Sequence, residues 1–257
     1  MNILKHLEKY GYAIQENVIS SKECSKMSRA LDSLKIKKEK NGSLLSTSFQ
    51  TVIKNVHLEQ PEVFLNKISL PKVMDIASRV LQDEFILSNF NASLSGKTGG
   101  SRVHIDSRVP ISDFKSTLQI VATLCIDDFT IKNGSTIVWP HTHTSGKDPK
   151  YVKRKSPYRG IQVNVPKGSI IYVLGQTWHD VGPNLNDQKR WGIIAYYSRW
   201  WIKPTFDFTK CGKKIFNKLS KKQKQLMGFT SIPPTNKENR TKTLMAVNKI
   251  PKNYDAI

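Results

Sequence analysis

Apolar residues in the first third of the chain recur at intervals of three and four, the spacing of one face of an α-helix. Residues 1–10 form a short amphipathic stretch, and 11–14 read as a short strand. Ser20 followed by Glu23 has the spacing of a capping box, which marks the start of a helix. The apolar face of that predicted helix consists of Cys24, Met27, Leu31 and Leu34.

A second helical pattern covers 61–82, and Pro71 inside it predicts two pieces, because proline lacks the amide hydrogen that a helix interior needs. From residue 85 the pattern changes to short apolar runs separated by glycine, proline and asparagine turns, which is typical of strands. The predicted strands cover 85–94, 117–126, 136–139, 162–165, 169–174 and 191–201.

Many short strands at this spacing indicate a β-sandwich or barrel, and the absence of a strand–helix alternation argues against a doubly wound sheet. We therefore predict one domain over 1–257. Its parts are a helical N-terminal region at 1–84, a β core at 85–204 and a basic C-terminal extension at 205–257. Within this extension, 217–227 read as a helix and 231–257 as loop.

Composition is that of a globular chain: 257 residues, of which 38% are hydrophobic. No apolar run approaches the roughly 18 residues of a membrane span, and the start lacks the apolar stretch of a secretory signal, so a cytoplasmic protein is expected. Cys24, Cys125 and Cys211 lie far apart and indicate neither a disulfide framework nor a CxxC metal pair.

The formal net charge of +21 leaves two interpretations open. One is an anionic partner, and the other is a compositional bias toward lysine. The basic residues are dispersed and no nucleic-acid motif is present, so a nucleic acid is not the expected partner. A small anionic substrate is favoured by the basic segment 147–155, which lies in a predicted loop. It is also favoured by Arg102 and Arg108, which lie on either side of His104 and Asp106.

Three metal-ligand types occur in a suggestive pattern. In an extended segment, residues i and i+2 point to the same side, so His104 and Asp106 can face one point. His179 ends a separate apolar run just before a predicted turn. Two imidazoles and one carboxylate on one face would leave three positions of an octahedral metal open, as in the facial triad of non-heme iron(II) oxygenases.

Arg190 lies eleven residues beyond His179, after a predicted turn, and should begin the next antiparallel strand. A guanidinium group can hold a carboxylate through two parallel hydrogen bonds. The distal carboxylate of 2-oxoglutarate is the natural partner for Arg190, if this side chain points into the same cavity.

In these features the sequence resembles the phytanoyl-CoA dioxygenase family. Its motifs follow in order at 11–20, 104–106, 126–128, 133–135, 140–143, 168–169, 179, 182–184 and 190. The resemblance implies a mainly β fold, a double-stranded β-helix (jelly-roll, cupin-like barrel) with flanking N-terminal helices. It also implies Fe(II), 2-oxoglutarate and O2 as cofactor and cosubstrates, with succinate and CO2 as co-products, and it suggests that Gln119 and Asn91 line the cosubstrate pocket.

Two positions qualify the resemblance. Val181 stands where family members often carry a serine that helps to hold oxoglutarate. Asp106 is present, which argues against the related halogenases. By position, His143 and His141 match a family segment that does not ligate the metal.

The predicted function is therefore an iron- and 2-oxoglutarate-dependent dioxygenase that hydroxylates an unactivated C–H bond of a small metabolite, with an anionic metabolite favoured by the basic residues. Two alternatives stay open at this point: a non-oxidative cupin-like metal-binding barrel, and a basic oxygenase directed at nucleic acid. The sequence specifies neither the substrate nor the oligomeric state.

Overall fold

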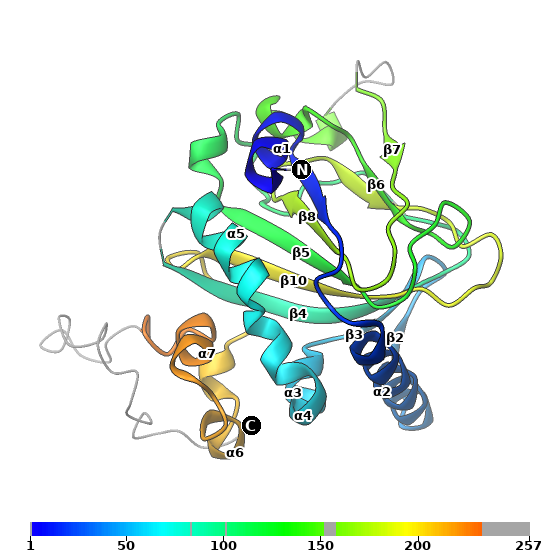
Figure 1. Cartoon of the computed structure of the whole chain (residues 1–257), viewed down its shortest axis with the longest axis vertical. Coiled ribbons are helices and arrows are strands. Elements are labelled where there is room, and N and C mark those ends of the chain that lie inside the picture. The colour runs from blue at the N-terminus through cyan, green and yellow to red at the C-terminus, as the bar shows by residue number, and fades with distance from the viewer. Residues whose placement is uncertain (1, 83, 101, 152–157, 233–257) are drawn as a thin grey trace, which may run out of the picture.

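The computed structural model describes residues 2–82, 84–100, 102–151 and 158–232. Its centre consists of two antiparallel sheets (Figure 1). The large sheet has the strand order β1-β8-β5-β10-β4-β3-β2 and the small one β7-β6-β9. The strands are β1 Tyr12–Gln15, β2 Leu45–Ser46, β3 Gln50–Ile53, β4 Phe85–Ser95, β5 Gln119–Cys125, β6 Thr136–Val138, β7 Ile161–Gln162, β8 Ile170–Leu174, β9 His179–Val181 and β10 Trp191–Arg199.

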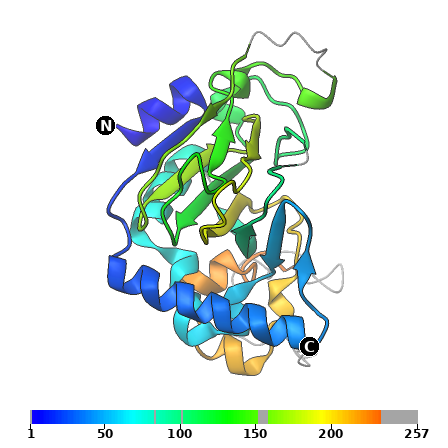
Figure 2. The same ribbon diagram turned by 90° about the vertical axis from the view of Figure 1, so that its right-hand side faces the viewer.

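Helices cover the outer face of the large sheet, where α5 crosses the strands (Figure 1), while α2 runs beneath them at one end of the molecule (Figure 2). The α-helices are α1 Ile3–Tyr10, α2 Ser21–Lys40, α3 Val56–Glu59, α4 Pro61–Phe64, α5 Pro71–Leu81, α6 Lys213–Phe216 and α7 Lys221–Leu226. Short 3-10 helices span Leu65–Ser69, Phe114–Ser116, Thr142–Thr144, Pro149–Tyr151 and Phe208–Lys210. The predicted mainly β jelly-roll with flanking helices is confirmed.

Strand alternation separates two apolar layers. In β5, Ile120, Ala122 and Leu124 belong to the large core beneath the helices. Cys125, on the other side of the same strand, belongs to a smaller cluster between the sheets. Because successive strand residues face opposite sides, the odd-numbered positions of β5 face the space between the sheets. That space holds the candidate site.

Local signals in the sequence account for most helix boundaries. The Ser20 side chain accepts from the Glu23 amide, and the Glu23 side chain contacts the Ser20 amide, so the predicted capping box begins α2. Pro71 divides the predicted 61–82 helix as expected and occupies the first turn of α5, where its missing amide hydrogen costs nothing.

Three predictions of secondary structure need correction. Besides β1, which matches the strand predicted at 11–14, the region 1–84 contains two strands that were not predicted, β2 and β3 of the large sheet. The three-residue strand β9 was not predicted, because its pairing with β6 is a tertiary contact. The predicted strand 162–165 is reduced to β7, with Val165 in an isolated bridge to Phe129.

Part of the basic segment 147–155 and nearly all of 231–257 lie outside the described residues. Cys24, Cys125 and Cys211 are not joined in disulfide bonds, and Cys24 and Cys125 are buried. Within the described part of the chain, no helix combines the length and apolar character needed to cross a membrane.

Candidate metal centre and cosubstrate pocket

Backbone pairing places the two predicted histidine ligands opposite each other. His104 and His179 form an antiparallel bridge with two N–H···O hydrogen bonds of 3.1 Å. The segment that contains His104 thus extends the small sheet alongside β9. Residues opposite each other in an antiparallel pair project to the same face, and the two imidazole centroids lie 4.4 Å apart.

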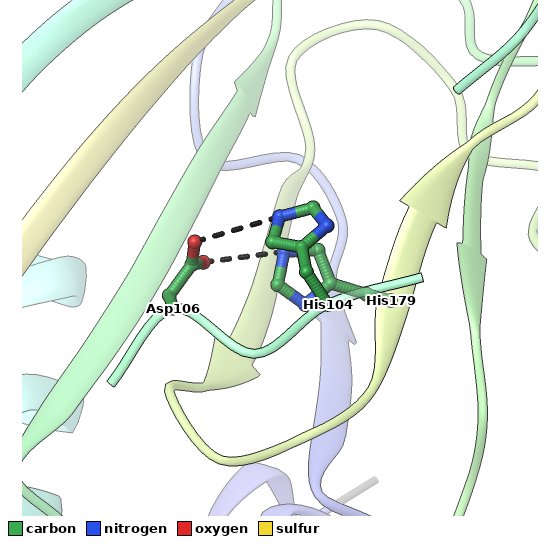
Figure 3. Close-up of side chains that lie close together, drawn as sticks. All are labelled: His104, Asp106 and His179. Atoms are coloured by element: carbon green, nitrogen blue, oxygen red, sulfur yellow. Dashed lines mark ion pairs between the residues drawn. The ribbon is translucent and has the colours of Figure 1, made fainter. Parts of the chain in front are cut away.

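Asp106 completes the cluster from the same segment. Its amide donates to the carbonyl of Gly175, at the end of β8, which fixes the backbone two residues beyond His104. Asp106 Oδ1 lies 3.7 Å from His104 Nε2, and Asp106 Oδ2 lies 3.2 Å from His179 Nε2 (Figure 3). One ligand atom from each of the three residues lies within 4.8 Å of the others.

Backbone carbonyls orient both imidazoles. His104 Nδ1 lies 3.1 Å from the Arg102 carbonyl oxygen, and His179 Nδ1 lies 3.0 Å from that of Thr177. Because a carbonyl only accepts, each Nδ1 carries the hydrogen in the neutral ring. Each Nε2 is then left with a lone pair toward Asp106, the arrangement that metal-bound histidines usually show.

The cluster fits a divalent metal ion. Asp106 Oδ2 is buried and has no hydrogen-bond partner, which is costly unless a cation compensates it. Burial alone would raise the pKa of the Asp106 carboxyl, but positive charge on the neighbouring imidazoles of His179 and His104, when they are protonated, outweighs it and lowers this pKa. The set of two nitrogens and one carboxylate suits iron(II) and leaves coordination positions open.

The cluster opens into a cavity of about 180 Å³ between the two sheets. Its apolar wall comes from alternate positions of β5, β8 and β10 in the large sheet. Its polar wall comes from the small sheet and from the other end of the large sheet, at β4 and the β2–β3 hairpin. The lining includes Phe49, Gln50, Ser93, Arg102, Val121, Thr123, Thr136, Val173, Val181, Arg190, Ile194 and Tyr196.

Arg190 lines this cavity and is 4% exposed. Its Nε and Nη2 atoms have no hydrogen-bond partner, and no carboxylate among the described residues forms an ion pair with it. Burial lowers its pKa to about 10, so the guanidinium still carries its charge at neutral pH. A buried cation with free donors is expensive unless an anion binds it.

The structure therefore brings four predicted residues, His104, Asp106, His179 and Arg190, to one cavity. The other two predicted residues, Asn91 and Gln119, are not among those that line it. Asn91 Oδ1 accepts from the Asn55 amide at 3.0 Å. Gln119 packs against Gly175. Their predicted contact with the cosubstrate has no support from the cavity lining and stays a prediction.

The neighbouring histidines serve the fold. His143 is buried against Gly11, with Nε2 2.8 Å from the Glu8 carbonyl oxygen. His141 is exposed, and its ring lies in a tilted contact with that of Tyr10. Neither joins the three-residue cluster, in agreement with their interpretation as non-ligands.

Several lining residues were missed by sequence reasoning. Thr123 and Val121 could have been found, since strand alternation of β5 puts them on the inner face. Phe49 and Gln50 could not, because the β2–β3 hairpin reaches the cavity only through pairing of β3 with β4. Ser93 Oγ donates to Gln50 Oε1 at 3.1 Å and fixes this amide at the cavity.

Comparison with known proteins agrees with this geometry. The model of the family described as phytanoyl-CoA dioxygenase (PhyH) matches residues 7–192. Dioxygenase af480 of Aspergillus fumigatus is 24% identical over 241 residues, which cover 88% of this chain and 76% of that protein.

Solved structures of two enzymes from nogalamycin biosynthesis share the fold. They are the non-heme alpha ketoglutarate dependent epimerase SnoN (TM-score 0.62, 14% identity, 77% of this chain and 82% of that one) and carbocyclase SnoK (TM-score 0.61, 15% identity, 77% and 83%). SnoN has been solved in complex with Fe3+, alpha ketoglutarate and nogalamycin RO.

Proposed function

Since this chain belongs to the phytanoyl-CoA dioxygenase family and is a 2-oxoglutarate-dependent non-heme iron dioxygenase, we propose that it hydroxylates an unactivated C–H bond of a small anionic molecule. In this proposal His104, Asp106 and His179 hold Fe(II), and Arg190 binds the distal carboxylate of 2-oxoglutarate. The observation that carries this assignment of iron and oxoglutarate is one cavity containing both a metal-ligand cluster and a buried, unpaired guanidinium.

Each protein group has a defined task in this proposal. Iron, oxoglutarate and O2 together supply the oxidant, and the balanced outcome is hydroxylated substrate, succinate and CO2. The carbonyls of Arg102 and Thr177 keep both Nε2 atoms available. The apolar side chains Val121, Val173 and Ile194 exclude water from the cavity, which strengthens the electrostatic attraction between Arg190 and a carboxylate.

An anaerobic titration of metal-free protein with Fe(II) and then 2-oxoglutarate tests the site assignment. A keto acid chelated to iron gives a visible charge-transfer band, which we expect in the wild type. We expect no band in His179→Ala and a band only at much higher oxoglutarate concentration in Arg190→Met. Tight iron binding without a band on adding oxoglutarate would overturn the assignment of the pocket.

The anionic character of the substrate rests on Arg102. This exposed residue lines the cavity on the same side of its extended segment as His104 and lies at the mouth. Arg108 flanks the motif on its other side, is exposed, and is not among the lining residues, which makes it a matched control.

A panel of carboxylic acids and their neutral amides should reveal this preference through substrate-stimulated consumption of oxoglutarate. We expect Arg102→Gln to raise the KM for the acids about 5- to 30-fold, as for the loss of one charge-assisted hydrogen bond, and to leave the amides unaffected. Arg108→Gln should change neither. Equal effects on acids and amides would contradict an anionic substrate.

Hydroxylation is tested by the fate of 18O2. The label should enter the product as well as succinate. Product formation without label would point instead to an oxidation of another kind, such as the epimerase or carbocyclase reactions named for SnoN and SnoK.

A further inference from the structure

The guanidinium of Arg190 is held in place by an aromatic face rather than by a counter-ion. Its Cζ lies 4.5 Å from the ring centroid of Phe129. Phe129 is fully buried, and its backbone forms two hydrogen bonds of 2.8 Å with Val165. The Phe129 ring is therefore held in a fixed position against the face of the Arg190 guanidinium.

Asp127 is the acidic side chain whose charge acts on Arg190, and it is already engaged. Its Oδ2 accepts from the Trp191 amide at 2.8 Å, and its Oδ1 accepts from Ser28 Oγ at 3.4 Å. A carboxylate paired directly with Arg190 would stabilise the cation but occupy its N–H groups. An aromatic face stabilises the cation from above or below and leaves the in-plane N–H donors unused.

A glycine near the start of β10 makes room for this ring. A Cβ at Gly192 would lie 2.7 Å from Phe129 Cζ and 3.4 Å from Thr123 Cγ2. Glycine weakens a strand interior, so its presence at a paired position of β10 calls for a physical reason. The close approach of the Phe129 ring provides that reason.

We propose that Phe129 and Gly192 form a positioning pair that aims the Arg190 guanidinium at the distal carboxylate of 2-oxoglutarate. Phe129 supplies the π face, and Gly192 supplies the space in which the ring lies. Neither residue lines the cavity, so both act through Arg190. The inference rests on the proposed role of Arg190.

Phe129→Leu removes the π face and keeps an apolar side chain. We expect it to weaken oxoglutarate binding about 5- to 30-fold, because the guanidinium is no longer held in its binding orientation by a contact of about that strength. Anaerobic calorimetry measures this affinity without turnover. Fe(II) affinity should stay unchanged. In turnover, the KM for oxoglutarate should rise while kcat at saturating oxoglutarate stays near wild type.

Two further variants separate positioning from folding. Gly192→Ala should displace the ring and also weaken oxoglutarate binding. In the double variant Gly192→Ala/Phe129→Leu, the added methyl occupies space left by the ring, so thermal stability should recover relative to either single variant while oxoglutarate affinity stays low.

Phe85→Leu is the matched control, a buried phenylalanine that contacts Tyr197 and is not near Arg190, and it should leave oxoglutarate affinity unchanged.

The outcomes distinguish this inference from the function on which it rests. If Arg190→Met binds oxoglutarate as tightly as wild type, the proposed role of Arg190 fails. If Arg190→Met loses binding while folded Phe129→Leu retains wild-type affinity, only the positioning role of Phe129 is wrong. Recovery of affinity together with stability in the double variant would also overturn it, because packing alone would then explain the effect.

Discussion

Arg190 and His57 are two of the three buried basic side chains among the described residues, with His143, that have nitrogens without partners, and they differ in what surrounds them. Arg190 opens onto a cavity that can receive an anion. His57 is fully buried between the rings of Phe90 and Phe208. Burial lowers the pKa of His57 to about 3, so it is neutral at physiological pH. The surroundings of Arg190 suit ligand binding, whereas the burial of His57 without hydrogen-bond partners lowers the stability of the fold.

His57 should make the protein acid-sensitive. Its pKa is about 6.5 in the unfolded chain and about 3 in the fold, so between these values the unfolded state binds the extra proton. Stability is then complete above pH 6.5 and falls by up to about 1.4 kcal/mol per pH unit as pH drops toward 3. Urea denaturation of His57→Leu should show a shallower pH dependence. The same slope in wild type and His57→Leu would contradict this, and the exposed His141→Leu serves as control.

At the scale of elements, the site depends on how strands join rather than on their propensities. The His104–His179 bridge attaches an otherwise irregular segment to the small sheet, and the Asp106–Gly175 hydrogen bond attaches it to the end of β8 in the large sheet. The turn into β8 is fixed just as tightly, because the Gly168 carbonyl accepts from the amides of Val18 and Ile19. This contact ties the N-terminal region to the strand that precedes His179.

Gly168→Ala should therefore be strongly destabilising. Gly168 has φ +82°, and a Cβ there would lie 2.2 Å from the Ile19 carbonyl oxygen, which is backbone and cannot move aside cheaply. We expect a loss of about 2–4 kcal/mol, combining left-handed strain with overpacking. Gly42 has φ +71° with nothing within 4 Å of its would-be Cβ, so Gly42→Ala should cost only about 1–2 kcal/mol. Equal losses in chemical denaturation would show that the contact with Ile19 is unimportant.

At the scale of the whole molecule, the net charge of +21 is spread over a chain that has few ion pairs among its described residues. Such a charge raises the energy of the compact state by self-repulsion. It could also attract a nucleic acid, the alternative that the composition left open. A small anionic substrate needs only a local positive charge at the cavity, such as that of Arg102, since Arg190 is assigned to oxoglutarate.

The melting temperature should rise when NaCl is increased from about 50 to 500 mM, because salt screens exposed charges. Reversing the exposed Lys213 and Lys214 to glutamate should reduce this effect, since less repulsion is left to screen. A salt-independent melting temperature would mean that the charge is locally compensated. Binding of DNA or RNA that falls steeply over the same salt range would favour the nucleic-acid alternative.

Sequence by itself determined the β-rich fold, the capping of α2 and the family motifs. Those features are local: an i, i+2 pair such as His104 and Asp106 faces one side of any extended segment, and Pro71 divides any helix. It also predicted that a strand begins at Arg190 after a turn, and β10 begins one residue later, at Trp191.

Tertiary structure alone decided which residues surround the cavity. Gln50 reaches the cavity through a hairpin that pairs with β4, whereas the Asn91 side chain accepts a hydrogen bond from the Asn55 amide. Each of these contacts joins segments about 35 to 45 residues apart, so a local sequence pattern does not predict it. The position of Phe129 beneath Arg190 depends on the missing side chain of Gly192, 63 residues away. The periodicity of a sequence indicates which face of a strand a residue occupies. Contacts across the barrel depend on the register between strands and on the packing of segments that are distant in the sequence.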